Sequence, residues 1–210
     1  MPNPLETNHT VSDLSKAGAS PRAGIGRRIF DIVVAFTAIF LVGPLLCFVA
    51  LAIRLESRGP ILFRSRRIGR WGHDIFLLKF RTMYMNAESS EIREYKIDAD
   101  PRITRVGRFL RKTSLDELPQ LLNVLTGDLS FIGPRAALPA EYQLYVGAAS
   151  ERFSVRPGLT GLWQVSGYPR QDFNSMIELD RMYVEHRNIW MDCKILWLTI
   201  VMTTTGRSAY

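Results

Sequence analysis

Residues 29–53 of the chain read IFDIVVAFTAIFLVGPLLCFVALAI. Asp31 is the single charged residue in this stretch, and the 22 residues from Ile32 to Ile53 carry no charge. An apolar run of about 20 residues is long enough to enter the hydrocarbon core of a bilayer. The sequence therefore predicts a membrane helix near the N-terminus, followed by a larger polar region.

A cleaved export signal has some support from the same residues. Arg27-Arg28-Ile29-Phe30 is similar to a twin-arginine start, and Ala50-Leu51-Ala52 is similar to a cleavage site. The apolar core, however, exceeds the roughly 7 to 15 residues that are usual in a signal. A helix that remains in the protein is therefore the favoured interpretation.

Arginines flank the apolar stretch on both sides. They are Arg22, Arg27 and Arg28 before it, and Arg54, Arg58, Arg64, Arg66, Arg67 and Arg70 after it. Because positive flanks favour the cytoplasmic side, a straight spanning helix does not satisfy both ends. Gly43-Pro44 lies inside the stretch, and the arms on either side, ~20 Å and ~14 Å long, are each too short to cross a ~30 Å core. We therefore predict a re-entrant helix broken at Gly43-Pro44, with a kinked spanning helix as the alternative.

The composition is that of an ordered protein with a basic surface. Of 210 residues, 47% are hydrophobic and 22% charged, which excludes a disordered chain and fits one domain with a membrane element. The net charge of +7 favours a polyanionic partner: nucleic acid, a lipid surface or a phosphorylated substrate. Cys47 and Cys193 make no zinc-ligand spacing with the three histidines, so neither a cysteine-rich metal site nor a disulfide framework is expected.

Three regions are expected along the chain. They are a disordered tail over residues 1–24, the re-entrant helix over 25–58, and a catalytic region over 59–210. In the last region, Ile61–Ile68 and Ile75–Met83 flank a glycine-containing turn and predict a β-hairpin. Alternation in the second strand places Lys79 and Arg81 on one face, ~6.6 Å apart.

Helical patterns occupy much of the remainder. The polar stretch Asn86–Lys96 is expected to be helical, and an amphipathic helix is expected to start near Asp100-Pro101. Two more helices are expected over Met176–Tyr183 and from Trp190 to Met202. The amphipathic helix and the last helix suit the plane of a lipid head-group layer. The predicted fold class is α+β and rich in helix, with the re-entrant membrane helix, interfacial amphipathic helices and a small β-hairpin.

A pair of adjacent carboxylates is the candidate catalytic centre. Ser114 followed by Glu117 is typical of a capping box, which places Asp116 and Glu117 in the first turn of a new helix. Acidic residues there serve in many proteins only to offset the helix dipole. Here they follow a basic helix, and Lys79, Arg81 and Arg135 supply positive charge elsewhere. One carboxylate of such a pair can attack phosphorus, and the other can hold a Mg²⁺ ion against pyrophosphate oxygens.

From Arg27 onward the chain resembles the small monotopic phosphoglycosyl transferases, the bacterial sugar transferases that start exopolysaccharide and related glycans. Six motifs occur in order over this region. They are KFRTM at 79–83, LRKTSLDELPQL at 110–121, GDLSFIGPR at 127–135, RPGLTGLWQVSG at 156–167, DRMY at 180–183 and DCKIL at 192–196.

This resemblance implies a reaction and a site. A sugar-1-phosphate passes from a UDP-sugar to a polyprenyl phosphate, namely undecaprenyl phosphate, at the cytoplasmic face of the bacterial inner membrane. The resemblance makes Asp116 the nucleophile and Glu117 the residue that serves Mg²⁺. It places Lys79, Arg111 and Arg135 at basic positions that bind phosphates. It also agrees with the re-entrant topology, and a homo-oligomer is left open.

Some positions depart from the family pattern. Ala136 replaces the proline expected after Arg135, Tyr168 replaces an arginine for which Arg170 is a stand-in, and Arg187-Asn188 replace Trp-Ser. Asp180 and Tyr183 share a helical face, so either a structural hydrogen bond or a substrate contact is expected of them. The chain is most similar to exopolysaccharide-initiating members, which implies a hexose donor, UDP-glucose or UDP-galactose.

Two other function classes compete with this interpretation. A nucleic-acid-binding module is disfavoured because the basic residues lie beside apolar segments and no aromatic-interleaved motif occurs. A membrane-anchored regulatory protein of polysaccharide synthesis is the alternative to the enzyme. It does not need Asp116, so loss of that side chain separates the two.

Overall fold

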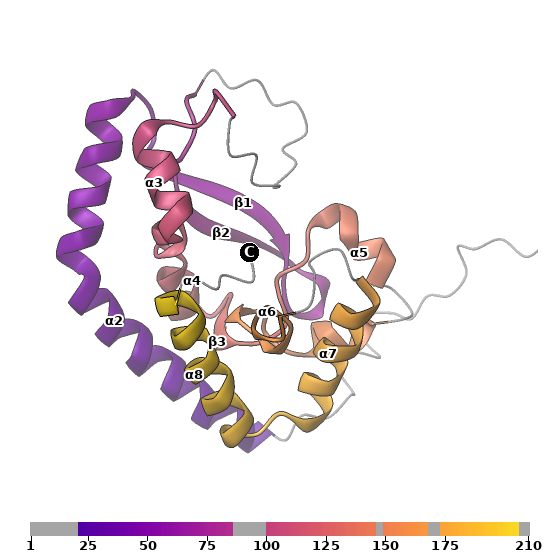
Figure 1. Ribbon diagram of the computed structural model, residues 1–210. Coiled ribbons are helices and arrows are strands. Elements are labelled where there is room, and N and C mark those ends of the chain that lie inside the picture. Colours follow the sequence, from indigo (N-terminus) through magenta and orange to yellow (C-terminus); the bar gives the residue numbers. More distant parts are fainter. Residues whose placement is uncertain (1–20, 86–99, 146–148, 168–172, 206–210) are drawn as a thin grey trace, which may run out of the picture. The chain divides into compact units, whose positions relative to one another are not determined.

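The computed structural model describes residues 21–85, 100–145, 149–167 and 173–205, with side chains from residue 24 onward (Figure 1). The chain forms two compact units. The first comprises residues up to Val33, Arg66–Ile75 and Val124 onward, and the second comprises Val34–Ser65 and Phe76–Asn123. The predicted helix over Asn86–Lys96 and most of the predicted tail lie outside the described residues.

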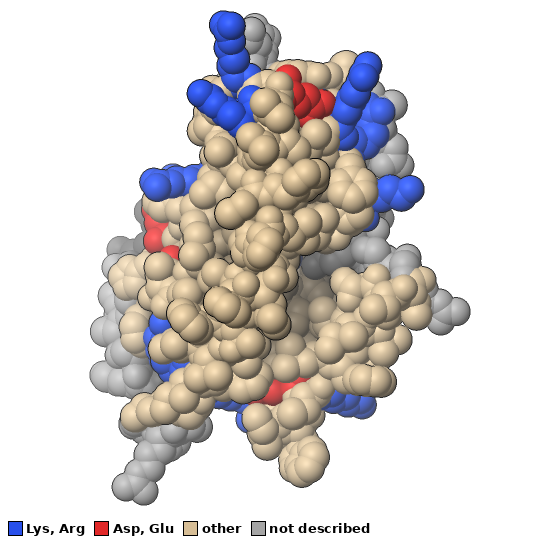
Figure 2. All heavy atoms as spheres, turned by 90° about the vertical axis from the view of Figure 1, so that its left-hand side faces the viewer, with Lys and Arg blue, Asp and Glu red and all other residues tan. Residues whose placement is uncertain are grey.

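The apolar stretch forms one long helix, α2, from Pro21 to Glu56. It begins inside the predicted tail, and it continues through Pro44 without interruption, so the break expected at Gly43-Pro44 is absent from α2. Its part from Gly24 to Glu56 is the one helix in the described residues that is long and apolar enough to cross a membrane, and little of it is buried. Figure 2 shows that uncharged side chains cover most of the face on which α2 lies. Large apolar side chains such as Phe40 and Leu55 are exposed on α2, which suits contact with a non-aqueous environment.

The predicted hairpin is present. Strand β1 runs over Leu62–Ile68 and strand β2 over Asp74–Phe80, joined by the single turn η1 over Arg70–Gly72. The two strands form a two-stranded sheet, with Arg66 bound to Asp74 across its base at 2.7 Å. The alternation of apolar and polar residues was a local signal, and for that reason the sequence located both strands to within a few residues.

The second unit also contains, in chain order, helix α3 (Arg105–Thr113), the turn η2 (Leu115–Glu117) and the start of helix α4 (Gln120–Thr126). Helix α3 begins later than predicted because Thr104 caps it, accepting a hydrogen bond from Gly107 N–H at 2.8 Å. Its apolar face packs on the end of α2. This core contains Val49, Ile53, Phe80 and Leu110, with Val106 and Leu115 beside them.

The first unit holds most of the shorter elements. They are β3 (Ser130–Ile132), α5 (Pro139–Tyr145), η3 (Ser150–Ser154), β4 (Gly158–Thr160), α6 (Leu162–Val165), α7 (Phe173–His186) and α8 (Ile189–Thr205). Strands β3 and β4 pair in parallel, which the sequence did not predict. Helices α7 and α8 confirm the two C-terminal helices and extend them.

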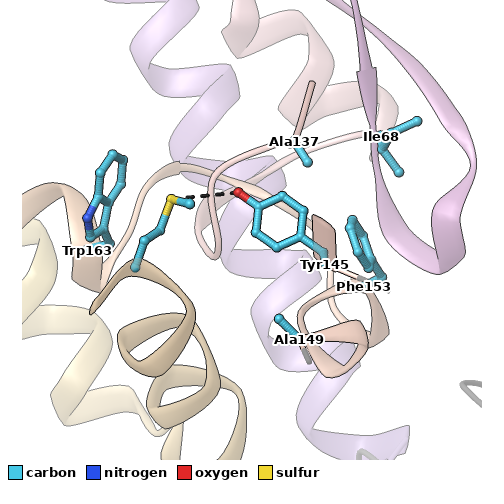
Figure 3. Packing of buried hydrophobic residues seen from close by; sticks show 7 residues of the cluster. Ile68, Ala137, Tyr145, Ala149, Phe153 and Trp163 are labelled. Carbon is cyan, nitrogen blue, oxygen red and sulfur yellow. Dashed lines mark hydrogen bonds between the residues drawn. The ribbon is translucent and has the colours of Figure 1, made fainter. Parts of the chain in front are cut away.

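Aromatic side chains fill the main core of the first unit (Figure 3). Tyr145 and Phe153 pack edge to face, with ring centroids 6.1 Å apart, and Trp163 is buried nearby. The Tyr145 hydroxyl donates to the Met176 sulfur at 3.8 Å. The observed fold confirms an α+β protein rich in helix.

Candidate active site

Asp116 and Glu117 lie in a single 3₁₀ turn between two helices. Helix α3 ends at Thr113, and Ser114 takes a left-handed backbone conformation, with φ of 57°. Its N–H donates to the carbonyls of Leu110 and Arg111, which closes α3. The Ser114 side chain makes no capping bond to η2, so the predicted capping box is wrong. Pro119 falls just before α4 and leaves the hydrogen bonds of that helix intact.

Lys79 reaches this turn from strand β2. Its ammonium group donates to Glu117 Oε1 at 3.2 Å. The Glu117 side chain is 44% exposed and that of Lys79 is 22% exposed, so the ion pair is open to solvent on the carboxylate side. The pair can therefore exchange partners with a charged ligand, because an exposed ion pair adds only about 0 to 1 kcal/mol to stability.

Asp116 is the more enclosed carboxylate of the two. Burial, followed by the neighbouring charge of Glu117, raises the pKa of Asp116 to about 6. The positive charges of Lys79 and Arg111 act in the opposite direction. A desolvated carboxylate that is still ionised near neutral pH is a suitable nucleophile.

Arg111 is held beside this turn by the segment that follows β2. Its Nε donates to Thr82 Oγ1 at 2.8 Å. Helix α3 approaches this segment so closely that a Cβ at Gly107 would overlap the carbonyl of Thr82. The close packing of glycine on backbone therefore fixes where the C-terminal turn of α3, with Arg111, lies.

Arg81 does not share the position of Lys79 at the carboxylates. It is 6% exposed, and its guanidinium donates to the carbonyls of Ser57 and Arg58 just after α2. These contacts tie the end of β2 to the end of the apolar helix. We therefore assign Arg81 a structural role and leave it out of the candidate phosphate site, because both of its terminal nitrogens are engaged by the protein.

Arg135 belongs to the other unit, in the segment after β3. It is half-buried, and its carbonyl accepts a hydrogen bond from Arg152 Nη2 at 2.7 Å. The missing family proline leaves Ala136 in its place, yet the backbone is held, since Ile68 N–H donates to the carbonyl of Ala137 at 2.9 Å. A role of Arg135 in binding phosphate stays a prediction.

Asp180 and Tyr183 have structural partners inside the first unit. Asp180 lies 3.0 Å from Arg152, an ion-pair distance without hydrogen-bond orientation, and both side chains are 2% exposed. Burial raises the pKa of Asp180, and Arg152 opposes that rise. The Tyr183 hydroxyl donates to Asp192 at 3.0 Å, and Asp192 also pairs with Arg27 at 2.7 Å. Their contacts support the structural alternative for both Asp180 and Tyr183.

Arg170 lies outside the described residues, so its predicted substrate contact is untested.

Asn123 is a residue of this site that sequence reasoning missed. It is 3% exposed, and its carboxamide bonds to the backbone of β2 on both sides of Leu77, accepting from Leu78 N–H and donating to the Phe76 carbonyl, each at 2.9 Å. The signal was a lone amide between the apolar Leu122 and Val124 of a short helix.

The residues present fit a Mg²⁺ ion bound together with a substrate. Among the described residues, no group of three or more His, Cys, Asp or Glu side chains could hold a metal by itself. Mg²⁺ in phosphoryl-transfer sites is commonly bound by one or two carboxylates, with phosphate oxygens and water completing its shell. The exposed carboxylate of Glu117, with Asp116 next to it, supplies that donor set.

An exposed apolar helix and a carboxylate pair beside a lysine define a membrane-anchored protein with a site suited to phosphate chemistry. The chain belongs to the bacterial sugar transferase family, whose model matches residues 22–206.

Named relatives agree with this family. The chain is 38% identical to the UDP-glucose:undecaprenyl-phosphate glucose-1-phosphate transferase of Escherichia coli over 91% of its length, but spans 43% of that protein. It is 37% identical to the undecaprenyl-phosphate galactose phosphotransferase of Salmonella typhimurium, covering 41% of it. The exopolysaccharide production protein ExoY of Sinorhizobium fredii is 38% identical, with 90% of both chains aligned. The chain thus spans less than half of the two longer relatives and nine tenths of ExoY.

Proposed function

We propose that the protein transfers a sugar-1-phosphate from a UDP-sugar to undecaprenyl phosphate and releases UMP, as the first membrane step of exopolysaccharide or related glycan synthesis. The observation that carries this proposal is the enclosed Asp116 next to Glu117, with Lys79 at 3.2 Å from Glu117, in a chain of the bacterial sugar transferase family.

The reaction proceeds in two displacements at one phosphorus. A carboxylate oxygen of Asp116 attacks the phosphorus that carries the sugar, and the bond from that phosphorus to the bridging oxygen breaks. UMP leaves with the electron pair, and a phosphosugar remains on Asp116. An oxygen of undecaprenyl phosphate then attacks the same phosphorus, the bond to Asp116 breaks, and the carboxylate is regenerated. This sequence lets one site accept a water-soluble donor and a lipid acceptor in turn.

Cations of the site bind and neutralise the phosphates. Lys79 and Arg111 act on Asp116 from β2 and α3, and both lower the pKa of its carboxyl. They keep the nucleophile ionised and are suited to contact the oxygens of the donor. For Arg135, a role in binding phosphate is proposed from the family resemblance alone. Mg²⁺, bound through Glu117, would neutralise pyrophosphate oxygens of the donor.

We propose a hexose donor without an N-acetyl group, UDP-glucose or UDP-galactose. Two relatives are named for glucose and galactose, and ExoY for exopolysaccharide production. The loops around Arg135 and from Pro157 to Arg170, in which the sequence places glycine turns near polar side chains, are the expected determinants of sugar choice.

Both ends of α2 are proposed to lie at the cytoplasmic face of the inner membrane. At its start, Arg28 donates to the carbonyls of Val124 and Leu125 at 2.5 Å and 2.6 Å. At its end, Glu56 accepts from the N–H groups of Arg105 and Val106 at 2.7 Å and 3.0 Å. Each end of α2 thus forms hydrogen bonds with residues that follow the helix in the sequence.

Within the residues that the structure describes, no helix after α2 is long and apolar enough to cross a bilayer. We propose that α2 bends at Pro44 in the membrane, because a proline inside a helix removes one backbone hydrogen bond, and that this bend replaces the predicted break as the means of re-entry.

The test is UMP release by the purified full chain in a bilayer with undecaprenyl phosphate, Mg²⁺ and each of several UDP-sugars. Release from UDP-glucose or UDP-galactose is expected, and Asp116→Asn should abolish it. Asp74→Asn, which changes an exposed carboxylate in the hairpin, is the matched control and should keep full activity. Preference for an N-acetylated or diamino sugar would overturn the hexose assignment alone. Absence of release from every donor would overturn the reaction and favour a regulatory protein.

A further inference from the structure

The carboxamide of Asn123 joins helix α4 to strand β2. In a strand, alternate residues direct their backbone groups to the same edge, so Phe76 and Leu78 present a carbonyl and an N–H together. Asn123 matches both groups, with one acceptor and one donor at 2.9 Å each. The amide therefore takes the place that a neighbouring strand would occupy and fixes the register of α4 along β2.

The two elements joined in this way carry the two partners of the Lys79–Glu117 ion pair. Lys79 follows Leu78 directly in β2, and Glu117 lies in η2, three residues before α4 begins. A displacement of α4 by one residue along β2 would move Glu117 by ~3.3 Å relative to Lys79. That is as large as the 3.2 Å that separates Lys79 Nζ from Glu117 Oε1.

We propose that Asn123 is a positioning residue, which holds Lys79 against the Asp116–Glu117 turn by fastening α4 to β2. This inference rests on the proposed function, since Lys79 and the carboxylates are its reacting groups. The two hydrogen bonds on which this role rests go to backbone groups of β2, so Asn123 is not proposed as a catalytic residue.

A purely stabilising role explains the choice of asparagine at position 123 less well than a positioning role does. The neighbours of Asn123 in α4 include Leu121 and Val124, which are 7% and 0% exposed, so the helix already buries an apolar face. A leucine at position 123, similar in size to asparagine, would extend the apolar face of α4. Aspartate or serine there would supply only part of the donor and acceptor pair. A shift of one residue along β2 would turn these backbone groups to the other edge and leave the amide unpaired, whereas an apolar side chain would tolerate such a shift.

A double-mutant cycle tests the proposal. Asn123→Leu and Lys79→Met are each expected to lower kcat for UMP release by roughly tenfold or more. The combination should be no more than about threefold worse than Lys79→Met, because once Lys79 is gone its position no longer matters. Val124→Ala, at the next residue of α4, removes buried methyl groups but keeps the carboxamide of Asn123, and its effect on kcat should multiply with that of Lys79→Met. Asn123→Ala replaces the leucine variant if that protein does not fold.

A second readout does not depend on activity. Lys79 is compared with the other lysines for its rate of acetylation, measured by mass spectrometry on the folded chain in a bilayer. Asn123→Leu and Glu117→Gln should each raise the acetylation rate at Lys79 at least threefold. The double variant should show no further rise. Val124→Ala should leave the acetylation rate at Lys79 unchanged.

Multiplicative loss of kcat, or an unchanged Lys79 rate in Asn123→Leu, would overturn the positioning role while the parent still releases UMP. If the parent releases no UMP from any donor, the proposed function fails, and the acetylation rates alone decide whether Asn123 positions Lys79.

Discussion

Replacing the proposed nucleophile should stabilise the protein. The pKa of Asp116 is raised from 3.8 to about 6, chiefly by burial and then by Glu117. A raised pKa means that the folded state disfavours the ionised form, so the ionised carboxylate of the parent lowers its stability at pH 7.5. With 1.36 kcal/mol for each pKa unit, the penalty is about 3 kcal/mol at most, and about 1 to 3 kcal/mol after allowance for solvent screening.

Asp116→Asn removes this penalty because its amide is neutral at every pH. For a chain of this size, about 1 to 3 kcal/mol corresponds to a rise in Tm of roughly 3 to 10 °C. The penalty is complete above the folded pKa and disappears as the pH falls towards the unfolded value, so about a third of it should remain at pH 4.5. The assay is thermal unfolding in nanodiscs at both pH values, with EDTA present and substrates absent.

The matched control is Asp74→Asn. Arg66 lowers the pKa of Asp74, so this exchange should bring no gain at pH 7.5. The reasoning about Asp116 would be refuted if Asp116→Asn were no more stable than the parent at pH 7.5, or if its gain were the same at pH 4.5.

Three further predictions concern activity and topology. Glu117→Gln should lower UMP release at least tenfold and flatten its dependence on Mg²⁺, measured by titrating the ion into EDTA-treated enzyme; full activity of the parent in EDTA would contradict a metal role. Lys79→Met should weaken use of the donor by roughly 10- to 100-fold in kcat/KM, since a charge-assisted hydrogen bond to phosphate is worth about 1.5 to 3 kcal/mol, and an unchanged kcat/KM would remove Lys79 from the site. Cysteines introduced as Arg22→Cys or Arg66→Cys, with Cys47 and Cys193 replaced by serine, should react with an impermeant maleimide only from the cytoplasmic side, whereas periplasmic labelling at either would indicate a spanning helix.

Local patterns predicted the elements around the site well. The uncharged run Ile32–Ile53 gave the apolar helix, and alternation gave the hairpin and the strand position of Lys79. These patterns depend on residues that are close together in the sequence, and the elements that they predicted are present in the fold. The carboxylate pair was found for the same reason, because Asp116 and Glu117 are adjacent.

Backbone conformation at helix ends and contacts over long sequence separation decided the rest. Ser114 was expected to start a helix, but the end of α3 uses it in a left-handed conformation that sequence patterns rarely predict for serine. Arg81 was expected beside Lys79, yet it binds the chain just after α2, 24 residues earlier. Periodicity placed Asp180 and Tyr183 on one face of α7 without revealing that this face is buried. Met176, four residues before Asp180 and also buried, was the available signal that the face belongs to the core.

The covalent intermediate provides the most direct test of the central claim. Purified enzyme is incubated with UDP-sugar and Mg²⁺ in the absence of undecaprenyl phosphate, quenched in acid, and analysed by mass spectrometry of the intact chain and of its peptides. The account predicts one added sugar phosphate, located on Asp116, with an equal amount of UMP released and the adduct lost when undecaprenyl phosphate is supplied. Asp116→Asn should give neither adduct nor UMP. Turnover by Asp116→Asn at the rate of the parent, or an adduct on another residue, would contradict it.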